Sequence, residues 1–454
     1  MDIFIDGYMD RSFNREIFVD DSIIGTNDEF SLTHADGTRL VCFDVRKLFN
    51  MCFAPGSIIY DLKMLYECDG DISRLIKSID DIDKGDYMEI ERRFSAHTRA
   101  LSESQVDVDS ISLKHCIPDD VRITYMHARQ TMMKVLWSRL SAEQISEYET
   151  NVWPLFKDLL VVENAKIKID EEYVKAQLKR NDVIVHEKKF LQSIQGLTHD
   201  GYVRTRINPV GSKTKRLRVD GGFNCMGIPH GVPRKALVSR FENGRIAVFD
   251  FNAIDYRCIV AATNDKGLNE FYMGQRDFHS RTASVLGDVT PDLRTNVKKI
   301  AYTHIYGGSK ETLQKQTALP SDVLRTYVAK LDELFEPITA FRKKISDQAR
   351  IDGFIITPGG NKVMIEKGDH DGKIIGLFAQ TYSSAMFNKA LHAVIERLES
   401  MNAKSRVIFT VHDELVIDRH PSETLLEDIQ IQMQNVTGFI VKAKEALNYG
   451  DATD

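Results

Sequence analysis

Two groups of acidic residues stand where apolar runs end. Asp250 follows the run Ile-Ala-Val-Phe at 246–249, and Asp413 and Glu414 lie between the apolar runs 406–411 and 415–417. A carboxylate in apolar surroundings is costly unless it is paired, hydrogen-bonded or bound to a metal. Mg²⁺ is held by one or two carboxylates together with substrate phosphates, and two such ions can clamp both oxygens of a phosphoryl transfer. The alternative is that these acids are solvated turn residues, and spacing alone does not bring the two groups together.

One predicted helix carries two cations and two aromatic rings along a single face. Thr290-Pro291-Asp292 is a typical helix start, with a capping hydroxyl, a proline in the first turn and an acid near the positive end of the dipole. Four residues then recur at intervals of four: Arg294, Lys298, Tyr302 and Tyr306. Each interval advances about 40° around a helix, so the four share a face. They could bind a polyphosphate and stack on a base. The alternative is an amphipathic helix whose tyrosines pack in the core.

The segment 202–240 is strongly cationic. Its one acidic residue is Asp220, against nine basic residues: Arg204, Arg206, Lys213, Lys215, Arg216, Arg218, Arg234, Lys235 and Arg240. Glycines and prolines in the segment predict a loop or hairpin. A phosphate backbone is the natural partner for such a segment, and a solvated basic face is the alternative.

The elements that must position these residues predict an α+β fold. Apolar runs indicate strands at 246–250, 406–411 and 414–417, and the turn 358–360 indicates a hairpin within 353–365. Helical periodicity dominates 118–190, 265–350 and 374–401, with breaks at Gly287 and at 307–308. Because the strands come late and in hairpins, we expect a largely antiparallel sheet.

Composition sets broad limits. The 454 residues are 43% hydrophobic and 28% charged, which is typical of a soluble globular protein, and no apolar run is long enough to span a membrane. The six cysteines form no C-x-x-C pair, so we expect no zinc site, no disulfide framework and a reducing compartment. Residues 1–100 hold 20 acidic and 12 basic residues, so the net charge of -6 belongs to this part of the chain. It does not argue against a nucleic-acid partner.

Three segments, in this order, resemble motifs A, B and C of the family A DNA polymerases, which include the bacterial repair polymerase, phage replicases and the mitochondrial enzyme. The segments are Asp250-Phe-Asn-Ala-Ile-Asp-Tyr-Arg257, Arg294-x3-Lys298-x3-Tyr302-x3-Tyr306-Gly307 and Val411-His412-Asp413-Glu414. Supporting similarities are Glu163–Asp170, Thr214–Leu217, Asn224–Pro229, Asp265–Leu268, Asp277–His279 and Gln380–Ala385. The resemblance covers about 150–420 and implies a right-hand fold of palm, fingers and thumb.

The resemblance also implies a role for each matching residue. Asp250 and Asp413 would bind two catalytic Mg²⁺ ions, supported by Glu414. The incoming nucleotide would be bound by Arg294, Lys298, His279, Tyr302 and Asp255, with Lys298 also counted as catalytic, and Asp255 at the position that blocks a ribose 2′-hydroxyl. DNA would be contacted by Arg216, Arg257, Tyr306, Gln380 and His412.

Several positions depart from the family pattern. Asp255 replaces the usual glutamate and is one methylene shorter, which predicts weaker exclusion of ribonucleotides; the alternative is a carboxylate that only caps a helix beginning at Asn252. Tyr302 stands where many bacterial members have Phe, which predicts sensitivity to dideoxynucleotides. Gly372 and Gly376 occupy the places of an upstream Arg and Asn, so template contacts near Gln380 are in doubt.

The two ends of the predicted polymerase region are reduced. Only 30 residues separate Asp170 from Asp200, where the family has several further thumb helices, which predicts low processivity or reliance on a partner. Relatives often carry a 3′–5′ exonuclease in the N-terminal region. Asp6 on the first strand has no glutamate two residues on, and Asp44 and Asp61 give only faint similarity. We interpret this region as a shrunken, inactive exonuclease-like domain, with an unrelated α/β cap as the alternative.

The prediction is therefore a DNA-directed DNA polymerase that uses two Mg²⁺ ions, dNTPs and primer–template DNA, without proofreading. Predicted boundaries are 1–110 for the exonuclease-like or cap domain, 111–240 for linker and reduced thumb, 241–264 with 351–454 for the palm, and 265–350 for the fingers. A phage or organelle-like replication or repair enzyme is expected, in the cytoplasm (the host's, for a phage) or an organelle, with a processivity or replisome partner and no membrane. A single-subunit RNA polymerase-like enzyme and a non-catalytic DNA-binding replisome component are the alternatives.

Overall fold

The computed structural model forms two compact units, Met1–Leu160 and Val161–Asp454. It describes residues 119–453 apart from 275–276, 309 and 318. Before residue 119 it describes only 2–9, 15–19, 22–26, 31–32, 39–42, 52–53, 59–65, 87, 89, 90 and 92. Asp44, which the sequence singled out, lies outside the described residues.

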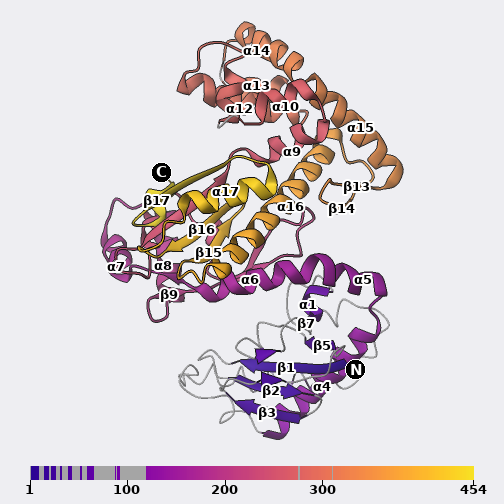
Figure 1. The fold of residues 1–454 in the computed structure, drawn as a ribbon, viewed down its shortest axis with the longest axis vertical. Coiled ribbons are helices and arrows are strands. Elements are labelled where there is room, and N and C mark those ends of the chain that lie inside the picture. The colour runs from indigo at the N-terminus through magenta and orange to yellow at the C-terminus, as the bar shows by residue number, and fades with distance from the viewer. Residues whose placement is uncertain are drawn as a thin grey trace. The chain divides into compact units, whose positions relative to one another are not determined.

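Unit 1 contains a five-stranded mixed sheet, which agrees with the predicted small α/β domain (Figure 1). Its order is β3-β2-β1-β5-β7, where β1 pairs antiparallel with β2, β2 antiparallel with β3, and β1, β5 and β7 run parallel. The strands are β1 Asp2–Met9, β2 Arg15–Val19, β3 Ser22–Thr26, β5 Arg39–Cys42 and β7 Ile59–Asp61, with a separate pair β4 Ser31–Leu32 and β6 Cys52–Phe53. The helices are α1 Leu62–Leu65, α4 Asp119–Ser138, α5 Ala142–Glu147, η3 Tyr148–Val152 and the first part of α6 Trp153–Ala165.

Aromatic packing ties this sheet to its helices. The ring of Tyr60 on β7 lies 5.0 Å from Trp137 on α4 and 5.9 Å from Tyr148. Tyr148 is buried and donates a hydrogen bond of 2.6 Å to the backbone oxygen of Ile59. Such rings supply large buried area with a polar group that still finds a partner.

Unit 2 is built on a four-stranded sheet of order β15-β16-β12-β17, antiparallel throughout as the sequence predicted. The strands are β12 Arg245–Phe251, β15 Arg406–Val411, β16 Glu414–Arg419 and β17 Val441–Ala446. Isoleucine, valine and phenylalanine are frequent in β12, β15 and β16, and such residues pack well on the pleated surface of a sheet.

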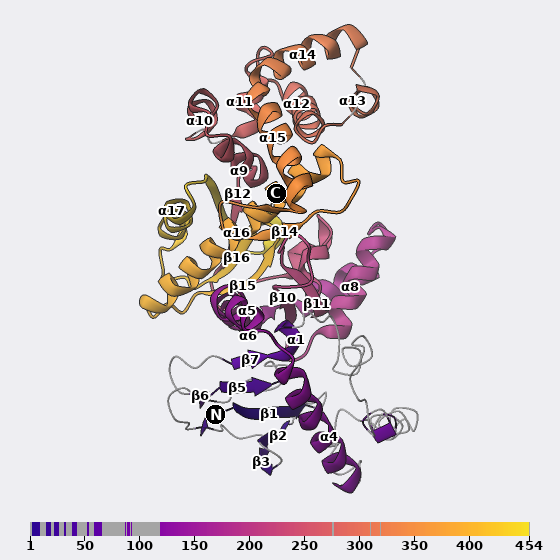
Figure 2. The ribbon, with the colours of Figure 1, turned by 90° about the vertical axis from the view of Figure 1, so that its right-hand side faces the viewer.

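The two faces of the sheet pack against different helices. Phe251 meets Phe387 of α16 Asp371–Ser400, which lies against α17 Leu426–Thr437. The other face, with Ile246 and Val248, shares a core with α7 Glu171–Lys179, α8 Val185–Leu197 and α18 Tyr449–Thr453. Figure 2 shows α17 on one side of β15 and β16, and α8 on the other.

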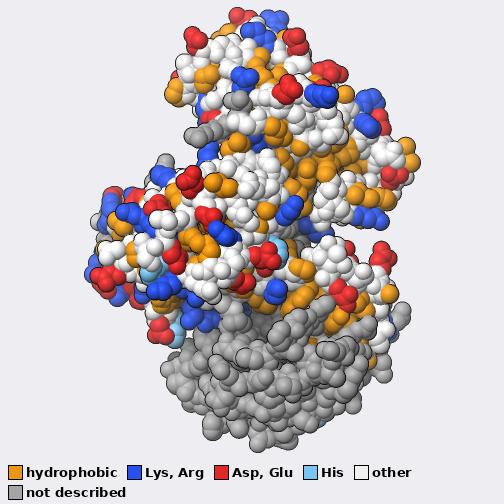
Figure 3. Space-filling model, viewed as in Figure 1, with side chains coloured by type: hydrophobic (Ala, Val, Ile, Leu, Met, Phe, Trp, Pro, Cys, Tyr) orange, Lys and Arg blue, Asp and Glu red, His pale blue; other side chains and the backbone are white. Residues whose placement is uncertain are grey.

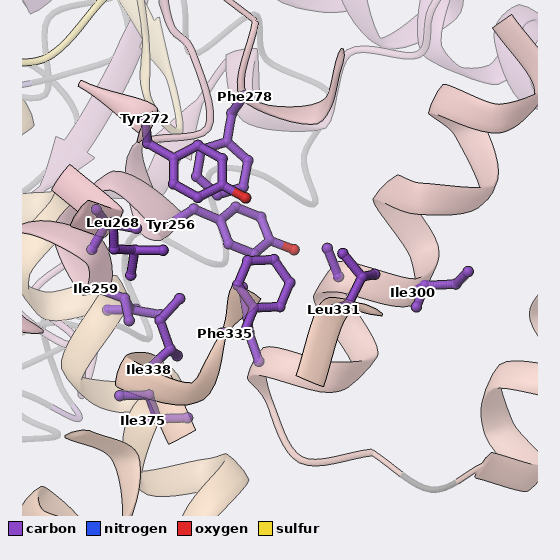
Figure 4. Packing of buried hydrophobic residues seen from close by; sticks show 14 of the residues in the cluster. Tyr256, Ile259, Leu268, Tyr272, Phe278, Ile300, Leu331, Phe335, Ile338 and Ile375 are labelled. Carbon is purple, nitrogen blue, oxygen red and sulfur yellow. The ribbon is translucent and has the colours of Figure 1, made fainter. Parts of the chain in front are cut away.

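The region between β12 and α16 is almost wholly helical. It comprises α9 Ile254–Thr263, α10 Lys266–Tyr272, α11 Phe278–Ala283, α12 Pro291–Ile305, α13 Lys310–Thr317, α14 Ser321–Leu334 and α15 Glu336–Asp352, then the hairpin β13 Phe354–Ile356 and β14 Lys362–Met364. Its core stacks Tyr272 on Phe278 at 4.0 Å and Phe278 on Tyr256 at 4.8 Å, with aliphatic side chains from α12, α14 and α15 around them (Figure 4). The predicted hairpin within 353–365 is confirmed.

Short elements complete unit 2. Strand β8 Ile167–Lys168 pairs with β9 Tyr202–Val203, and only α7 and α8 lie between them. The cationic segment forms the hairpin β10 Thr205–Asn208 and β11 Arg218–Gly222, followed by η4 Cys225–Gly227 and η5 Val232–Ala236.

The surface of unit 2 is mixed in charge (Figure 3). Apolar side chains gather beside α15 and the β13–β14 hairpin, where Ile351, Ile356 and Met364 are exposed. Among the described residues, no helix combines the length and the apolar composition that crossing a bilayer requires.

Candidate active site

The two acidic groups meet at one end of the central sheet. Asp250 on β12 and Glu414 on β16 are directly opposite each other in the antiparallel register. Asp413 lies in the two-residue turn between β15 and β16, and the backbone N–H of Phe251 approaches its carbonyl oxygen at 3.4 Å. His412, the other turn residue, takes a left-handed backbone with φ of 56°. A tight turn and one strand register therefore bring together acids that are far apart in sequence.

Burial, together with the charge of at least one neighbouring carboxylate, raises the pKa of each of the three acids. Burial, with the charges of Asp413 and Glu414, raises the pKa of Asp250 to about 7. Burial also raises the pKa of Asp413, in the same direction as the charge of Asp255 and against those of Arg216 and His412. Burial raises the pKa of Glu414, although the hydroxyl of Tyr449 donates it a hydrogen bond of 2.6 Å that acts in the opposite direction.

Such a site fits a divalent cation, because repelling, half-buried carboxylates lose their mutual penalty when a cation binds. No group of three or more His, Cys, Asp or Glu side chains among the described residues is arranged to hold a metal. Two carboxylates such as Asp250 and Asp413 are a donor set that Mg²⁺ can use, since this ion takes one or two carboxylates and completes its shell with water and substrate phosphates.

A cationic helix face lies close enough to act on these acids. Helix α12 begins at Thr290, whose side chain accepts a hydrogen bond of 3.1 Å from the N–H of Leu293, and it ends before Gly307, which has φ of 70°. The predicted start and end are confirmed. Lys298 on this helix is exposed, and its charge lowers the pKa of both Asp250 and His279.

Arg294 and His279 are held by a capping aspartate. Asp277 caps α11 and also accepts hydrogen bonds of 2.8 and 3.3 Å from Arg294. Although burial alone would raise the pKa of Asp277, the hydrogen bonds from Arg294 and Ser280 hold it well below its usual range. Burial, reinforced by Lys298 and Arg294, lowers the pKa of His279 to about 4. His279 is therefore neutral near pH 7, and its buried Nδ1 has no hydrogen-bond partner among the described residues.

Three tyrosines line the same side of α12. The ring of Tyr256 lies 4.5 Å from Tyr302, edge to face, and Tyr302 stacks on Tyr306 at 6.1 Å. The Tyr302 side chain is 36% exposed. Tyr306 is more buried, and this burial raises the pKa of its hydroxyl above its ordinary range. Gly372 of α16 makes room for Tyr306, because a Cβ at Gly372 would lie 1.9 Å from the Tyr306 carbonyl oxygen.

Asp255 is fixed by two partners. Arg216 places one Nη2 atom 2.9 Å from both oxygens of the Asp255 carboxylate, and Ser383 donates a hydrogen bond of 2.5 Å to Oδ1. The expectation that Asn252 caps the helix is wrong: α9 begins after Ala253, which has a left-handed backbone. The side chain of Asn252 instead accepts hydrogen bonds from Phe278 N–H and Arg257.

The residues predicted to touch DNA fall into two groups. Arg216 and Tyr306 lie near Asp255. His412 is exposed beside Asp413. Gln380 is half-buried on α16, and its backbone carbonyl oxygen accepts a hydrogen bond from the Ser383 hydroxyl. Arg257 differs: it is fully buried and donates hydrogen bonds to the carbonyl oxygens of Asn252 and Tyr272. Burial lowers its pKa to about 10. A side chain so enclosed does not reach a duplex, so the predicted contact of Arg257 with DNA is wrong.

The cationic segment is partly neutralised by acids from elsewhere in the chain. Besides the pair of Arg216 with Asp255, Lys213 pairs with Glu366, Lys235 with Asp451 at 2.8 Å, and Arg240 with Asp418 at 2.7 Å. The segment itself has nine basic residues and one acid, but in the folded chain acids from other segments pair with four of those basic residues.

Three residues near the site were not predicted. Lys442 on β17 is directly opposite Asp250, Tyr449 on α18 bonds to Glu414, and Ser383 bonds to Asp255. The alternation of Val441 and Ala443 with lysines is a strand signal that could have indicated β17. No local signal pointed to Tyr449.

Comparison with known proteins gives matches to polymerases. The model of the DNA polymerase family A matches residues 119–453. DNA polymerase I of Caldicellulosiruptor bescii is 24% identical over 273 residues, 55% of this chain and 32% of that protein. The thermostable DNA polymerase I of Thermus aquaticus is 24% identical over 250 residues, 50% of this chain and 30% of that protein. The DNA polymerase of Mycobacterium phage D29 is 24% identical over 219 residues, 47% of this chain and 35% of that protein.

The chain thus matches about a third of the length of these relatives. Among solved structures, the POL domain of Pol1 from M. smegmatis, in complex with DNA primer-template and dNTP, superimposes with a TM-score of 0.70 at 15% identity. That match covers 100% of this chain and 96% of that domain, and it establishes the right-hand polymerase fold.

Proposed function

Because the chain belongs to DNA polymerase family A, we propose that it is a template-directed DNA polymerase that adds dNTPs to the 3′-hydroxyl of a DNA primer. One observation carries the proposal. Asp250 on β12 and Asp413 in the turn between β15 and β16 meet at one sheet end, and the charge of Lys298 on α12 lowers the pKa of Asp250. Carboxylates opposite cations are the arrangement that metal-assisted transfer of a nucleotide needs.

The chemistry follows from the charges. When bound at Asp250 and Asp413, two Mg²⁺ ions would supply charge neutralisation for the attacking and leaving oxygens. Arg294, Lys298 and the neutral His279 bind the triphosphate, by cationic pairing and by hydrogen bonding. The primer 3′-hydroxyl gives its proton to water as its oxygen bonds to the α-phosphorus. The bond from that phosphorus to the β-phosphate oxygen breaks, and pyrophosphate leaves with that electron pair.

The sugar and base are positioned by the polar and aromatic residues beside this site. Asp255, held by Arg216, faces the ribose 2′ position, while Tyr302 stacks near the base and sugar and Tyr306 lies near the templating base. Arg216, Gln380 and His412 contact the primer–template near its terminus. The support for these roles is that Tyr302, Tyr306 and Asp255 cluster together in the fold.

Within this proposal, residues 241–264 and 351–454 act as palm and 265–350 as fingers. Residues 111–240 act as linker and thumb, of which residues 111–160 belong to unit 1. Only two short helices lie between β8 and β9. A thumb this small grips a duplex over little area, so we expect low processivity without a partner. Long products from one binding event, measured with a trap and no added protein, would contradict this.

Residues 1–110 are proposed to be an exonuclease-like domain without proofreading activity, in a phage or organelle-like replication or repair enzyme. Asp6 lies on β1 and Asp61 ends β7 in the same sheet, but the described residues include no carboxylate two positions after Asp6. Degradation of a mismatched primer with Mg²⁺, abolished by Asp6→Ala, would overturn the inactive assignment.

Primer extension with dNTPs and Mg²⁺ tests the function. We expect the wild type to extend an annealed primer and Asp413→Asn, which keeps the side-chain shape, to fail while still binding DNA; Asp288→Asn, an exposed loop residue, is the matched control. Primer-independent RNA synthesis from a promoter would favour the RNA polymerase alternative. DNA binding without nucleotide addition by the wild type would favour the non-catalytic alternative.

A further inference from the structure

Lys442 extends the row of acids across the central sheet. Strand β17 lies beside β12, and Lys442 is the register partner of Asp250, just as Glu414 is on the other side. Side chains directly opposite in antiparallel strands point to the same face, with Cβ atoms about 4.5–5.5 Å apart. Glu414, Asp250 and Lys442 therefore form one row across three strands, in the order acid, acid, cation.

The Lys442 side chain has no ion pair with any residue in the described part of the chain. It is exposed, and among the residues that the structure describes it forms no hydrogen bond or salt bridge. Lys213, Lys235 and Lys373, by contrast, each pair with a carboxylate. An unpaired ammonium beside a half-buried acid is available to a ligand.

Two lysines from different elements act on the same space. Lys442 on β17 and Lys298 on α12 both lower the pKa of His279 on α11. The charge of the Lys442 ammonium therefore acts on the side of the row where α11 places His279. Lys298, Arg294 and Lys442 all lower the pKa of His279 by their positive charge, and Asp277 acts in the opposite direction.

We infer that Lys442 is a further polyphosphate-binding residue, which contacts the β- and γ-phosphates of the incoming nucleotide, and then the pyrophosphate product, from the β17 side. The two cations proposed to bind the triphosphate, Arg294 and Lys298, both lie on α12, whereas Lys442 would approach it from β17. A lysine is a compact point charge on a flexible stem, suited to reach phosphate oxygens beside Asp250. The inference rests on the proposed function, since it assigns a residue to the same nucleotide site.

The variants Lys442→Met, Lys442→Arg and Lys444→Met separate this role from general charge effects. Lys444 lies on the same strand and the same face, two residues further from the Asp250 row, opposite Val248. Its replacement removes the same charge at the greater distance. Two ligands are measured: Mg²⁺-pyrophosphate binding by calorimetry, and dNTP binding to a complex with a dideoxy-terminated primer, where no chemistry occurs.

We expect Lys442→Met to weaken both affinities about tenfold, equivalent to about 1.4 kcal/mol. Lys442→Arg should keep most of both affinities. Lys444→Met should change both affinities less than twofold, and none of the variants should change the affinity for primer–template DNA by more than twofold. Unchanged pyrophosphate and dNTP affinity in Lys442→Met, or an equal loss in Lys444→Met, would overturn the inference. A wild type that binds Mg²⁺-pyrophosphate but never extends a primer would refute the proposed function alone, because the calorimetric comparison would still decide the role of Lys442.

Discussion

Replacing Asp250 with asparagine should stabilise the metal-free protein at high pH. The folded structure raises the pKa of Asp250 from 3.8 to about 7 by burial and by the charges of Asp413 and Glu414. A group whose pKa is raised on folding binds its proton more tightly in the native state. Its ionised form therefore opposes folding once the pH exceeds the unfolded pKa, and the penalty grows until the pH passes about 7.

The size of the effect follows from the shift. Each pKa unit corresponds to about 1.36 kcal/mol, so a rise of about three units sets an upper limit of roughly 4 kcal/mol at pH 8.5. Part of this remains in Asp250→Asn, because a buried amide also loses hydration. We expect a gain in the free energy of unfolding of about 1–3 kcal/mol at pH 8.5, falling to near zero at pH 4.

The assay is urea denaturation with a chelator present, followed by circular dichroism from pH 4 to 8.5. Asp288→Asn removes a carboxylate from an exposed position and should change stability by less than about 0.5 kcal/mol. Saturating Mg²⁺ should stabilise the wild type more than Asp250→Asn, because the cation relieves the repulsion among the acids. A destabilised Asp250→Asn at pH 8.5, or a gain that does not depend on pH, would refute the reasoning.

The other predictions concern a buried ion pair, the sugar site and the stacked tyrosines. Arg240→Met leaves the fully buried carboxylate of Asp418 without its 2.7 Å ion-pair partner, so the free energy of unfolding in urea should fall by roughly 3–5 kcal/mol. Adding Asp418→Asn should recover much of that loss. Equal stability of the single and double variants would contradict this prediction. Asp255→Glu should exclude ribonucleotides more strongly than the wild type in single-nucleotide incorporation, because the longer side chain reaches further toward the 2′ position, and equal selectivity would sink this. Tyr302→Phe should make the enzyme less sensitive to dideoxynucleotides, with dNTP incorporation and the packing against Tyr256 largely kept; failure of dideoxy terminators to compete with the wild type at near-equal concentration would show that the role of Tyr302 is wrong.

Local chemistry was enough to predict several elements from the sequence. The hydroxyl of Thr290, the proline after it and Gly307 define both ends of α12, because capping and a positive φ depend on neighbouring residues only. The turn at 412–413 and the hairpin at 353–365 follow from similar short-range signals. The order of the three motifs was also sufficient to indicate the family.

Contacts between distant segments required the tertiary structure. No residue near Arg216 or Arg240 in the sequence indicates that they pair with Asp255 and Asp418. The segment is therefore cationic in sequence, but its charge is partly neutralised in the folded chain. Arg257 looks like a surface cation in its motif, but the packing of α9 against α10 buries it and supplies backbone oxygens as partners.

The active site itself divides in the same way. The sequence by itself determined which acids, cations and rings are present and on which elements they lie. Only the strand order β16-β12-β17 decided that Glu414, Asp250 and Lys442 share a row, because sheet pairing joins residues that no local rule connects. Burial then set the ionisation of these groups, since the pKa of a carboxylate depends on which charges and apolar atoms surround it after folding.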